Sequence, residues 1–161
     1  MTLILPIIIV ASLFCLVVLT GAPYLPTLKP QATEAIELLN LKQGQTLLEL
    51  GSGDGRVLRL AAQKGINAVG YEINPILVVV SYLVTYKYRK NVKIIWANFW
   101  TSSWPQADGV YVFLIEGFMQ RLNTKVDQYH HKPIKVVSLA YKIKGKRSIK
   151  ESGSLILYRY D

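Results

Sequence analysis

Three glycines at alternate positions, Gly51, Gly53 and Gly55, join an apolar segment to an amphipathic one. The apolar segment, Thr46–Leu50, predicts a short buried strand, and the apolar periodicity of residues 55–64 predicts a helix. Glycine adopts positive φ readily and lets a ligand approach the backbone, and a helix N-terminus exposes free N–H groups. The turn therefore predicts a ligand site between a strand and a helix.

Strands and helices alternate along most of the chain, as in a parallel sheet covered by helices on both faces. A last strand without an intervening helix pairs antiparallel. The predicted fold class is α/β, a Rossmann-like and mostly parallel sheet with an antiparallel final strand. Strands are expected at 46–50, 67–71, 93–97, 109–115, 134–143 and 154–160, and helices at 31–40, 55–64, 75–89 and 116–129.

An uncharged run, Leu3–Leu19, precedes this domain, and the first charged residue is Lys29. A bilayer core about 30 Å thick needs about 17–25 apolar residues. The absence of a preceding Lys or Arg argues against a signal peptide, and the length of the run and its lack of a polar stripe argue against a buried core helix. We expect residues 1–22 to be a retained single-pass transmembrane anchor, with the C-terminal side cytoplasmic. Residues 23–44 are expected to form a linker and amphipathic helix, and residues 45–161 one ligand-binding domain.

The spacing of the turn narrows the class of ligand. Neither Gly51 nor Gly53 begins a G-x-G-x-x-G dinucleotide fingerprint, and the Gly-Lys-Ser/Thr of a phosphate-binding loop is absent. Glu49 and Asp54 bracket the turn. Two carboxylates repel a pyrophosphate and favour a ligand that carries positive charge.

Polar residues also end the next two predicted strands, which should bring them to the same edge of the sheet. Glu72 follows Gly55 by 17 residues, and a carboxylate there can accept hydrogen bonds from both ribose hydroxyls. Asn98 and Phe99 follow the third strand. Three strand ends in order indicate a nucleoside-containing ligand.

The pattern Glu49-x-Gly51-x-Gly53-x-Gly55 resembles the first motif of class I S-adenosylmethionine-dependent methyltransferases. The resemblance implies that S-adenosyl-L-methionine is the cofactor, with the glycines against its methionyl portion and Glu49 near its amino group. It also implies that Glu72 binds the ribose and that Ile73 and Phe99 line the adenine pocket. Many family members carry Asp where this chain has Asn98, whose side-chain oxygen can accept the adenine amino group. The implied cofactor-binding residues are Glu49, Gly51, Ser52, Gly53, Asp54, Gly55, Glu72, Ile73, Asn74, Asn98 and Phe99.

A narrower resemblance covers the chain up to about residue 116. Membrane-anchored lysine methyltransferases of mitochondria, and their bacterial and archaeal relatives, share an apolar N-terminal segment, a stretch like Tyr24-Leu-Pro-Thr27, and a similar core. Those enzymes methylate lysines of membrane proteins, including the c subunit of ATP synthase and the adenine nucleotide carrier. The resemblance implies a protein-lysine N-methyltransferase that acts on a lysine-bearing membrane protein, from the cytoplasmic or mitochondrial matrix side.

Lysine methylation requires a deprotonated amine, although the pKa of lysine is about 10.4. A pocket of low polarity disfavours the charged form. We expect Tyr24, Pro26 and Thr27 to cover such a pocket, and Glu116, at the fourth strand end, to meet a lysine ammonium. The alternative for Glu116 is an acid stabilised by a helix dipole. No residue is assigned as catalytic.

The charge of the chain does not identify its binding partner. The chain has a net charge of +9, and residues 86–161 hold 14 Lys/Arg against five Asp/Glu. Such a surface suits anionic lipid or nucleic acid, or is simply solvated. Alternatives to the leading function are methylation of a lipid or membrane-bound small molecule, and a non-catalytic membrane adaptor. A nucleic-acid partner is disfavoured because the sequence contains no Asn/Asp-Pro-Pro-Tyr/Phe tetrapeptide. The sequence also predicts no metal site, because it has one cysteine and its histidines are the single pair His130-His131.

Overall fold

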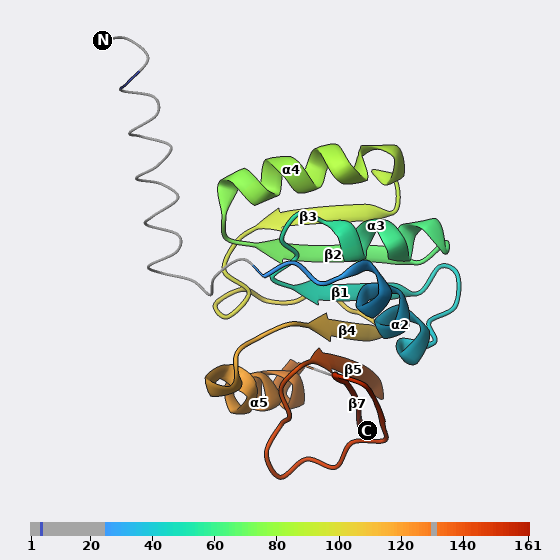
Figure 1. Ribbon diagram of the computed structural model, residues 1–161, viewed down its shortest axis with the longest axis vertical. Helices are drawn as coiled ribbons and strands as arrows, with labels where there is room; N and C mark the ends of the chain where they lie inside the picture. Colours follow the sequence, from blue (N-terminus) through green and yellow to red (C-terminus); the bar gives the residue numbers. More distant parts are fainter. Residues whose placement is uncertain (1–3, 5–24, 130–131) are drawn as a thin grey trace.

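The computed structural model describes residue 4, residues 25–129 and residues 132–161 (Figure 1). The predicted anchor, apart from that single residue, and Tyr24 lie outside these described residues. Within them, no helix is both long enough and apolar enough to cross a bilayer.

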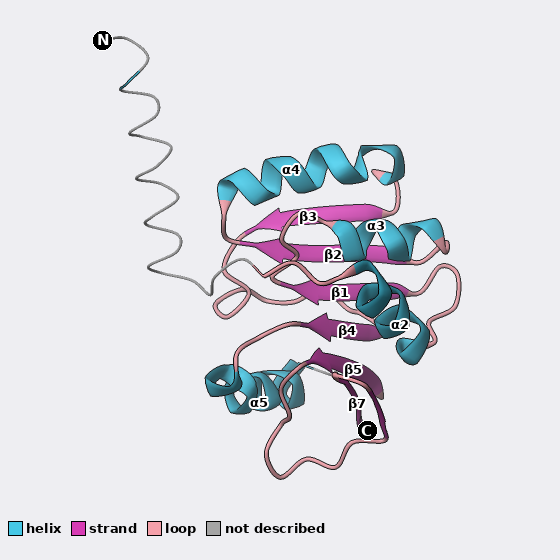
Figure 2. Ribbon diagram, in the orientation of Figure 1, coloured by secondary structure: helices cyan, strands magenta, loops and turns pink. Residues whose placement is uncertain are grey.

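The described chain builds one seven-stranded sheet (Figure 2) with the order β3-β2-β1-β4-β5-β7-β6. Neighbouring strands from β3 to β5 run parallel, and β7 is antiparallel to both β5 and β6. The predicted mostly parallel α/β sheet with an antiparallel final strand is therefore confirmed. The strands are β1 (Thr46–Leu50), β2 (Asn67–Glu72), β3 (Val92–Trp96), β4 (Gly109–Val112), β5 (Ile134–Leu139), β6 (Lys150–Ser152) and β7 (Leu155–Tyr160).

Helices cover both faces, as predicted. One buried cluster joins side chains of α2 (Lys29–Leu39), α3 (Arg56–Gln63) and α4 (Pro75–Thr85) to the sheet. The other cluster lies beneath α5 (Met119–Tyr129). Figure 1 shows α4 at the β3 edge of the sheet, which places it at one margin of the molecule. The described residues also form two 3₁₀ helices, η1 (Tyr86–Tyr88) and η2 (Glu116–Phe118).

Helix α2 shows how the local sequence produces these layers. Pro30 lies in its first turn, where the missing N–H costs nothing. Ala32, Ala35, Ile36 and Leu39 recur at helical spacing and are almost fully buried. Burial of a Leu or Ile side chain contributes about 1.5–3 kcal/mol, so this stripe fixes the helix against the sheet.

Several predicted boundaries were too long, for physical reasons that the structure shows. Ala140 has φ +74°, so the strand expected to reach residue 143 ends at Leu139. The strand expected to reach residue 115 ends at Val112, before Ile115 turns to solvent. The crossover from β3 to β4 contains no helix, and a loop that buries Trp104 covers that part of the sheet.

The strand order indicates where a ligand would bind to such a sheet. From β1, successive strands extend to β2 and β3 on one side and to β4 and β5 on the other. The direction of winding therefore changes between β1 and β4, at the carboxyl ends of parallel strands. The glycine turn follows β1 at that position.

Candidate functional site

The glycine turn folds back over the second strand. Gly51, Gly53 and Gly55 have φ of +82°, +55° and +78°. Other residues pay about 1–2 kcal/mol for this backbone region, which explains three glycines at alternate positions. The N–H groups of Gly51 and Ser52 donate to the carbonyl oxygen of Tyr71 at 2.9 and 2.8 Å, which fixes the turn against β2.

The carboxylate of Glu72 joins two of the strand ends. Its Oε2 accepts a hydrogen bond from Gly53 N at 2.8 Å, and its Oε1 accepts from Ile73 N and Asn74 N at 2.9 and 2.8 Å. Asn74 in turn caps α4, because its Oδ1 accepts from Ile76 N at 2.9 Å. The structure thus brings together the predicted residues of the first two strand ends.

Glu49 is buried beneath the turn, and its Oε2 has no hydrogen-bond partner among the described residues. Burial raises the pKa of this carboxyl well above its ordinary value, and the neighbouring carboxylates of Asp54 and Glu72 raise it further. A cationic ligand would relieve this repulsion and restore the charged form. The electrostatics therefore fit a ligand with an ammonium or sulfonium group.

The backbone at Gly51 faces open space. A Cβ placed there would meet no atom within 4 Å, whereas a Cβ at Gly55 would overlap Ser81 Oγ and lie 3.2 Å from Ser81 Cα. Gly55 is thus required both by its φ and by the approach of α4, whereas Gly51 is required by its φ of +82° and by no neighbouring atom among the described residues. Open backbone beside buried acids is what S-adenosylmethionine would need here.

The third strand end is arranged differently from the first two. Asn98 begins a turn, with its Oδ1 accepting from Trp100 N at 2.9 Å. Phe99 is half-buried against Trp100, with ring centroids 4.6 Å apart. The structure therefore gives both residues a local structural role, and their contacts with adenine stay predictions.

Sequence reasoning missed Trp96, the last residue of β3. Its Nε1 donates to the carbonyl oxygen of Ile73 at 3.1 Å, and both side chains are exposed. An apolar surface therefore lies beside Glu72. The only available signal was an aromatic residue at the end of a predicted strand.

A polar clasp ties the segment before α2 to the glycine turn. Asp54 and Arg56 form a two-point ion pair, with Nε–Oδ1 at 3.0 Å and Nη2–Oδ2 at 2.7 Å. Arg56 Nη1 donates to the carbonyl oxygen of Thr27 at 3.2 Å, and Thr27 Oγ1 lies 2.8 Å from the Tyr111 hydroxyl. Burial raises the pKa of Tyr111, so this hydroxyl stays protonated. Thr27 is buried beside the turn, whereas Pro26 is exposed.

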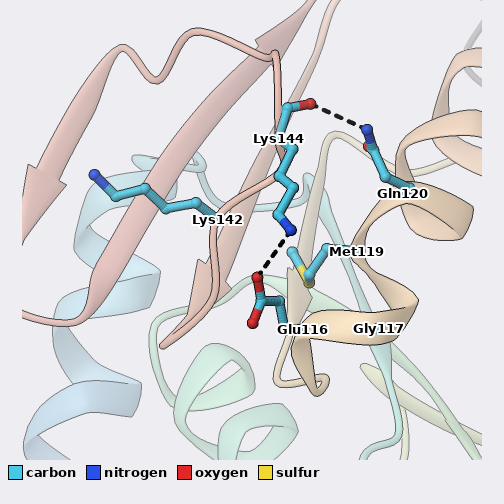
Figure 3. Close-up of a pocket in the computed structure, with 6 residues that line it drawn as sticks. All are labelled: Glu116, Gly117, Met119, Gln120, Lys142 and Lys144. Carbon is cyan, nitrogen blue, oxygen red and sulfur yellow. Dashed lines mark hydrogen bonds and ion pairs between the residues drawn. The ribbon is translucent and has the colours of Figure 1, made fainter.

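Glu116 lies on the wall of a pocket of about 350 Å³ (Figure 3). Its Oε1 is 3.3 Å from Nζ of Lys144, and Gln120 Nε2 donates to the Lys144 carbonyl oxygen at 3.2 Å. Glu116 does meet a lysine ammonium, but that of its own chain. Because both side chains are exposed, the pair contributes at most about 1 kcal/mol and can open. The pocket is lined by Glu116, Gly117, Met119, Gln120, Lys142 and Lys144.

Comparison with solved structures identifies the class of protein. An RNA methyltransferase from Salinibacter ruber, solved with S-adenosyl-L-homocysteine, superimposes with a TM-score of 0.77 and 25% sequence identity, over 84% of this chain and 92% of that one. The fold and the turn are those of a class I S-adenosylmethionine-dependent methyltransferase, which confirms the resemblance found in the sequence. Residues 49–150, more than half of the chain, match the model of the ANTKMT methyltransferase domain, and the chain belongs to that family.

Two curated lysine N-methyltransferases are similar to this chain in sequence. The human lysine N-methyltransferase named for the c subunit of ATP synthase is 29% identical over 121 residues, which are 74% of this chain and 52% of the relative. A protein-lysine N-methyltransferase of Saccharolobus islandicus is 28% identical over 128 residues, which are 76% of this chain and 79% of the relative. The chain therefore spans about half the length of the human protein.

Proposed function

We propose that this chain is a protein-lysine N-methyltransferase that modifies a membrane protein and uses S-adenosyl-L-methionine. The observation that carries the proposal is the acidic, glycine-rich turn, in which Glu72 accepts a hydrogen bond from Gly53 N while Oε2 of the buried Glu49 has no hydrogen-bond partner among the described residues. In this proposal Gly51, Ser52, Gly53 and Asp54 hold the methionyl end, and Glu72, Ile73, Asn74, Asn98 and Phe99 hold the adenosine.

The bound cofactor supplies an activated methyl group, and this chain's residues supply position and electrostatics. The clasp at Thr27 keeps one wall of the turn in place. Glu116 is proposed to receive the substrate ammonium in exchange for Lys144. Such pairing favours the charged amine, so Glu116 orients the substrate, and loss of the proton requires surroundings less polar than those of this exposed carboxylate.

The membrane protein substrate rests on two further observations. Among the relatives are lysine N-methyltransferases named for two proteins, the c subunit of ATP synthase and the adenine nucleotide translocase. The run Leu3–Leu19 has the length and composition of a membrane span. Residues 1–22 as an anchor, residues 23–44 as a linker with α2, and residues 45–161 as the methyltransferase domain complete the proposal.

The test is to incubate the full chain with membranes of its source cells and radiolabelled S-adenosylmethionine. We expect label on lysine of a membrane protein, and none with the Glu72→Ala variant. Label extracted into organic solvent would instead select the lipid or small-molecule alternative. Failure of the chain to bind S-adenosylhomocysteine would leave only the non-catalytic adaptor.

RNA methylation is a second candidate, favoured by the RNA methyltransferase of matching fold and by the charge of +9. Adding total RNA to the same reaction separates the two. If the label is found in RNA rather than in protein, and if this labelling decreases as the salt concentration rises, RNA is the substrate.

Gly51→Ala should weaken the binding of S-adenosylhomocysteine at least about tenfold, or about 1.4 kcal/mol, because the new methyl group fills the open backbone face. Gly44→Ala is the matched control, since its φ is +81° and it too has nothing within 4 Å. Both variants should lose about 1 kcal/mol of stability from the strained backbone. Equal affinities of the two variants, measured by calorimetry, would contradict this placement of the cofactor.

Cofactor affinity should rise with pH until the raised pKa of Glu49 is passed, and then level off. Below that pKa the carboxyl is neutral, so a cationic ligand must displace a proton to gain the ion pair. Calorimetry in buffers of different ionisation enthalpy should show proton release in this range. Glu49→Gln should bind more weakly and without the pH dependence, whereas Glu37→Gln on the surface should behave as wild type.

The raised pKa of Glu49 also predicts how the stability of the free protein depends on pH, and this dependence has the opposite sign to that of cofactor affinity. Because the folded-state pKa of Glu49 lies above its unfolded value, the free protein loses stability as pH rises between the two. Glu49→Gln should therefore raise the free energy of unfolding at neutral pH, by about 1 kcal/mol or more. Thermal melts of both proteins without cofactor check the sign.

A further inference from the structure

Helix α4, together with Tyr86 at the start of η1, presents large apolar side chains to solvent. Ile76, Val79, Leu83 and Tyr86 are 40%, 59%, 73% and 65% exposed. They recur at spacings of three and four residues, so they form one stripe, which we call the α4 apolar face. The opposite side of the helix, which packs on the domain, buries Val78, Ser81 and Thr85. This arrangement reverses the usual amphipathic order of a surface helix.

The packing of the helix explains why the reversal is tolerated. A Cβ on Gly55 would overlap Ser81 Oγ, so α4 approaches the glycine turn too closely for large inward side chains. The buried hydroxyl of Thr85 finds its hydrogen-bond partner within the helix, because Oγ1 donates to the carbonyl oxygen of Ser81 at 2.7 Å. Small residues are therefore required inside, but nothing in the domain requires large apolar residues outside.

The exposed apolar surface continues beyond the helix. Of the thirteen exposed large hydrophobic side chains in the described residues, seven lie between residues 73 and 96. Tyr82 and Trp96 are among them, and each donates its polar group to a backbone carbonyl, of Ile94 and Ile73 respectively. Aromatic side chains of this kind are enriched where membranes meet water.

The charged side chains next to this surface are all basic. Residues 73–107 contain Lys87, Arg89, Lys90 and Lys93 but no Asp or Glu. All four are exposed, and none has an acidic partner within ion-pair distance among the described residues. Arg89 stacks over the Tyr86 ring at 4.7 Å, which brings a cation directly to the end of the apolar face.

We propose that the α4 apolar face lies on the surface of a bilayer that contains anionic phospholipid. An apolar stripe flanked by Lys and Arg is the arrangement by which a helix lies in the plane of a membrane surface. Figure 1 shows α4 at the β3 margin of the sheet, and the exposed side chains of the α4 apolar face show that this face is left open to solvent. The proposal concerns how the domain lies on lipid, and it does not depend on which molecule is methylated.

Such a contact would bring the bilayer next to the candidate site. The N-cap of α4, Asn74, is two residues from Glu72, and both hydrogen-bond within the same turn. A substrate lysine close to the lipid surface would then reach the cleft without leaving the membrane.

The test uses the full chain with Cys15→Ser, carrying a single cysteine for an environment-sensitive fluorophore. Leu83→Cys samples the α4 apolar face, and Lys150→Cys on β6, at the other margin of the sheet, is the matched control. The proteins are reconstituted in vesicles in which phosphatidylserine is about a third of the lipid, or in pure phosphatidylcholine. Nitroxide groups on the lipid chains act as quenchers.

We expect the probe at position 83 to be blue-shifted and quenched by lipid nitroxide at least about threefold more than the probe at position 150. Quenching should be stronger with phosphatidylserine, and Lys87→Glu with Lys90→Glu should reduce it. A probe at position 83 that stays in water in both vesicles would overturn the proposal. A blue shift without lipid quenching would also overturn it, and would assign the face to a second copy or to residues 1–24.

Discussion

Glu72→Gln should lower the affinity for S-adenosylhomocysteine by about 100-fold, or about 2.7 kcal/mol. The carboxylate accepts three backbone N–H groups, from Gly53, Ile73 and Asn74. A glutamine offers one acceptor oxygen, and its NH₂ group would face at least one of these donors. Hydrogen bonds to a charged group contribute about 1.5–3 kcal/mol each, so losing one of them and the proposed ribose contact gives this magnitude.

Calorimetry measures the affinity, and a thermal melt separates it from folding. The variant should also lose about 1–3 kcal/mol of stability, the cost of an unsatisfied buried N–H. Glu37→Gln provides the control, because Glu37 lies on the surface of α2 and its one ion pair within the described part of the chain is with Lys64 at 3.2 Å. A folded Glu72→Gln protein with wild-type affinity would show that the adenosine is held elsewhere.

Gly55→Ala should lower the free energy of unfolding by about 2–4 kcal/mol. About 1 kcal/mol or more comes from a side chain at φ +78°, and overpacking against Ser81 adds about 1–3 kcal/mol. For a domain of this size the melting temperature should fall by about 2–4 °C per kcal/mol.

The paired variant Ser81→Gly tests the cause. It removes the overlapping Oγ, so the double variant should recover most of the overpacking term. Gly145→Ala, at φ +77° with nothing within 4 Å, should lose only the backbone term. If Gly55→Ala and Gly145→Ala melt alike, the close approach of α4 does not limit stability.

The parts of the fold that follow from local pattern were predictable. Glycines at 51, 53 and 55 identified the turn, and the spacing to Glu72 identified the second strand end. Strand β6 was missed because its three residues, Lys150–Ser152, carry no apolar alternation. Its position follows only from pairing with β7, which is a tertiary contact.

The contacts around the glycine turn join residues that are far apart in sequence, and no sequence pattern predicts them. Arg56 reaches the Thr27 carbonyl across 29 positions, and Thr27 reaches Tyr111 across 84. For α4 the sequence predicted a helix but not its orientation, because apolar residues occur on every side of it. The inward face is set by Ser81 meeting Gly55, which only the folded chain reveals.

In the proposed membrane-anchored arrangement, the contacts of Thr27 would limit how far the domain can stand from the bilayer. With residues 1–22 in the bilayer, as proposed, five peptide units separate Ala22 from Thr27, and at full extension they span about 17 Å. Thr27 itself is held to Arg56 and Tyr111, so slack elsewhere in the chain adds nothing. Target lysines would then be selected by their height above the lipid as much as by the residues around them.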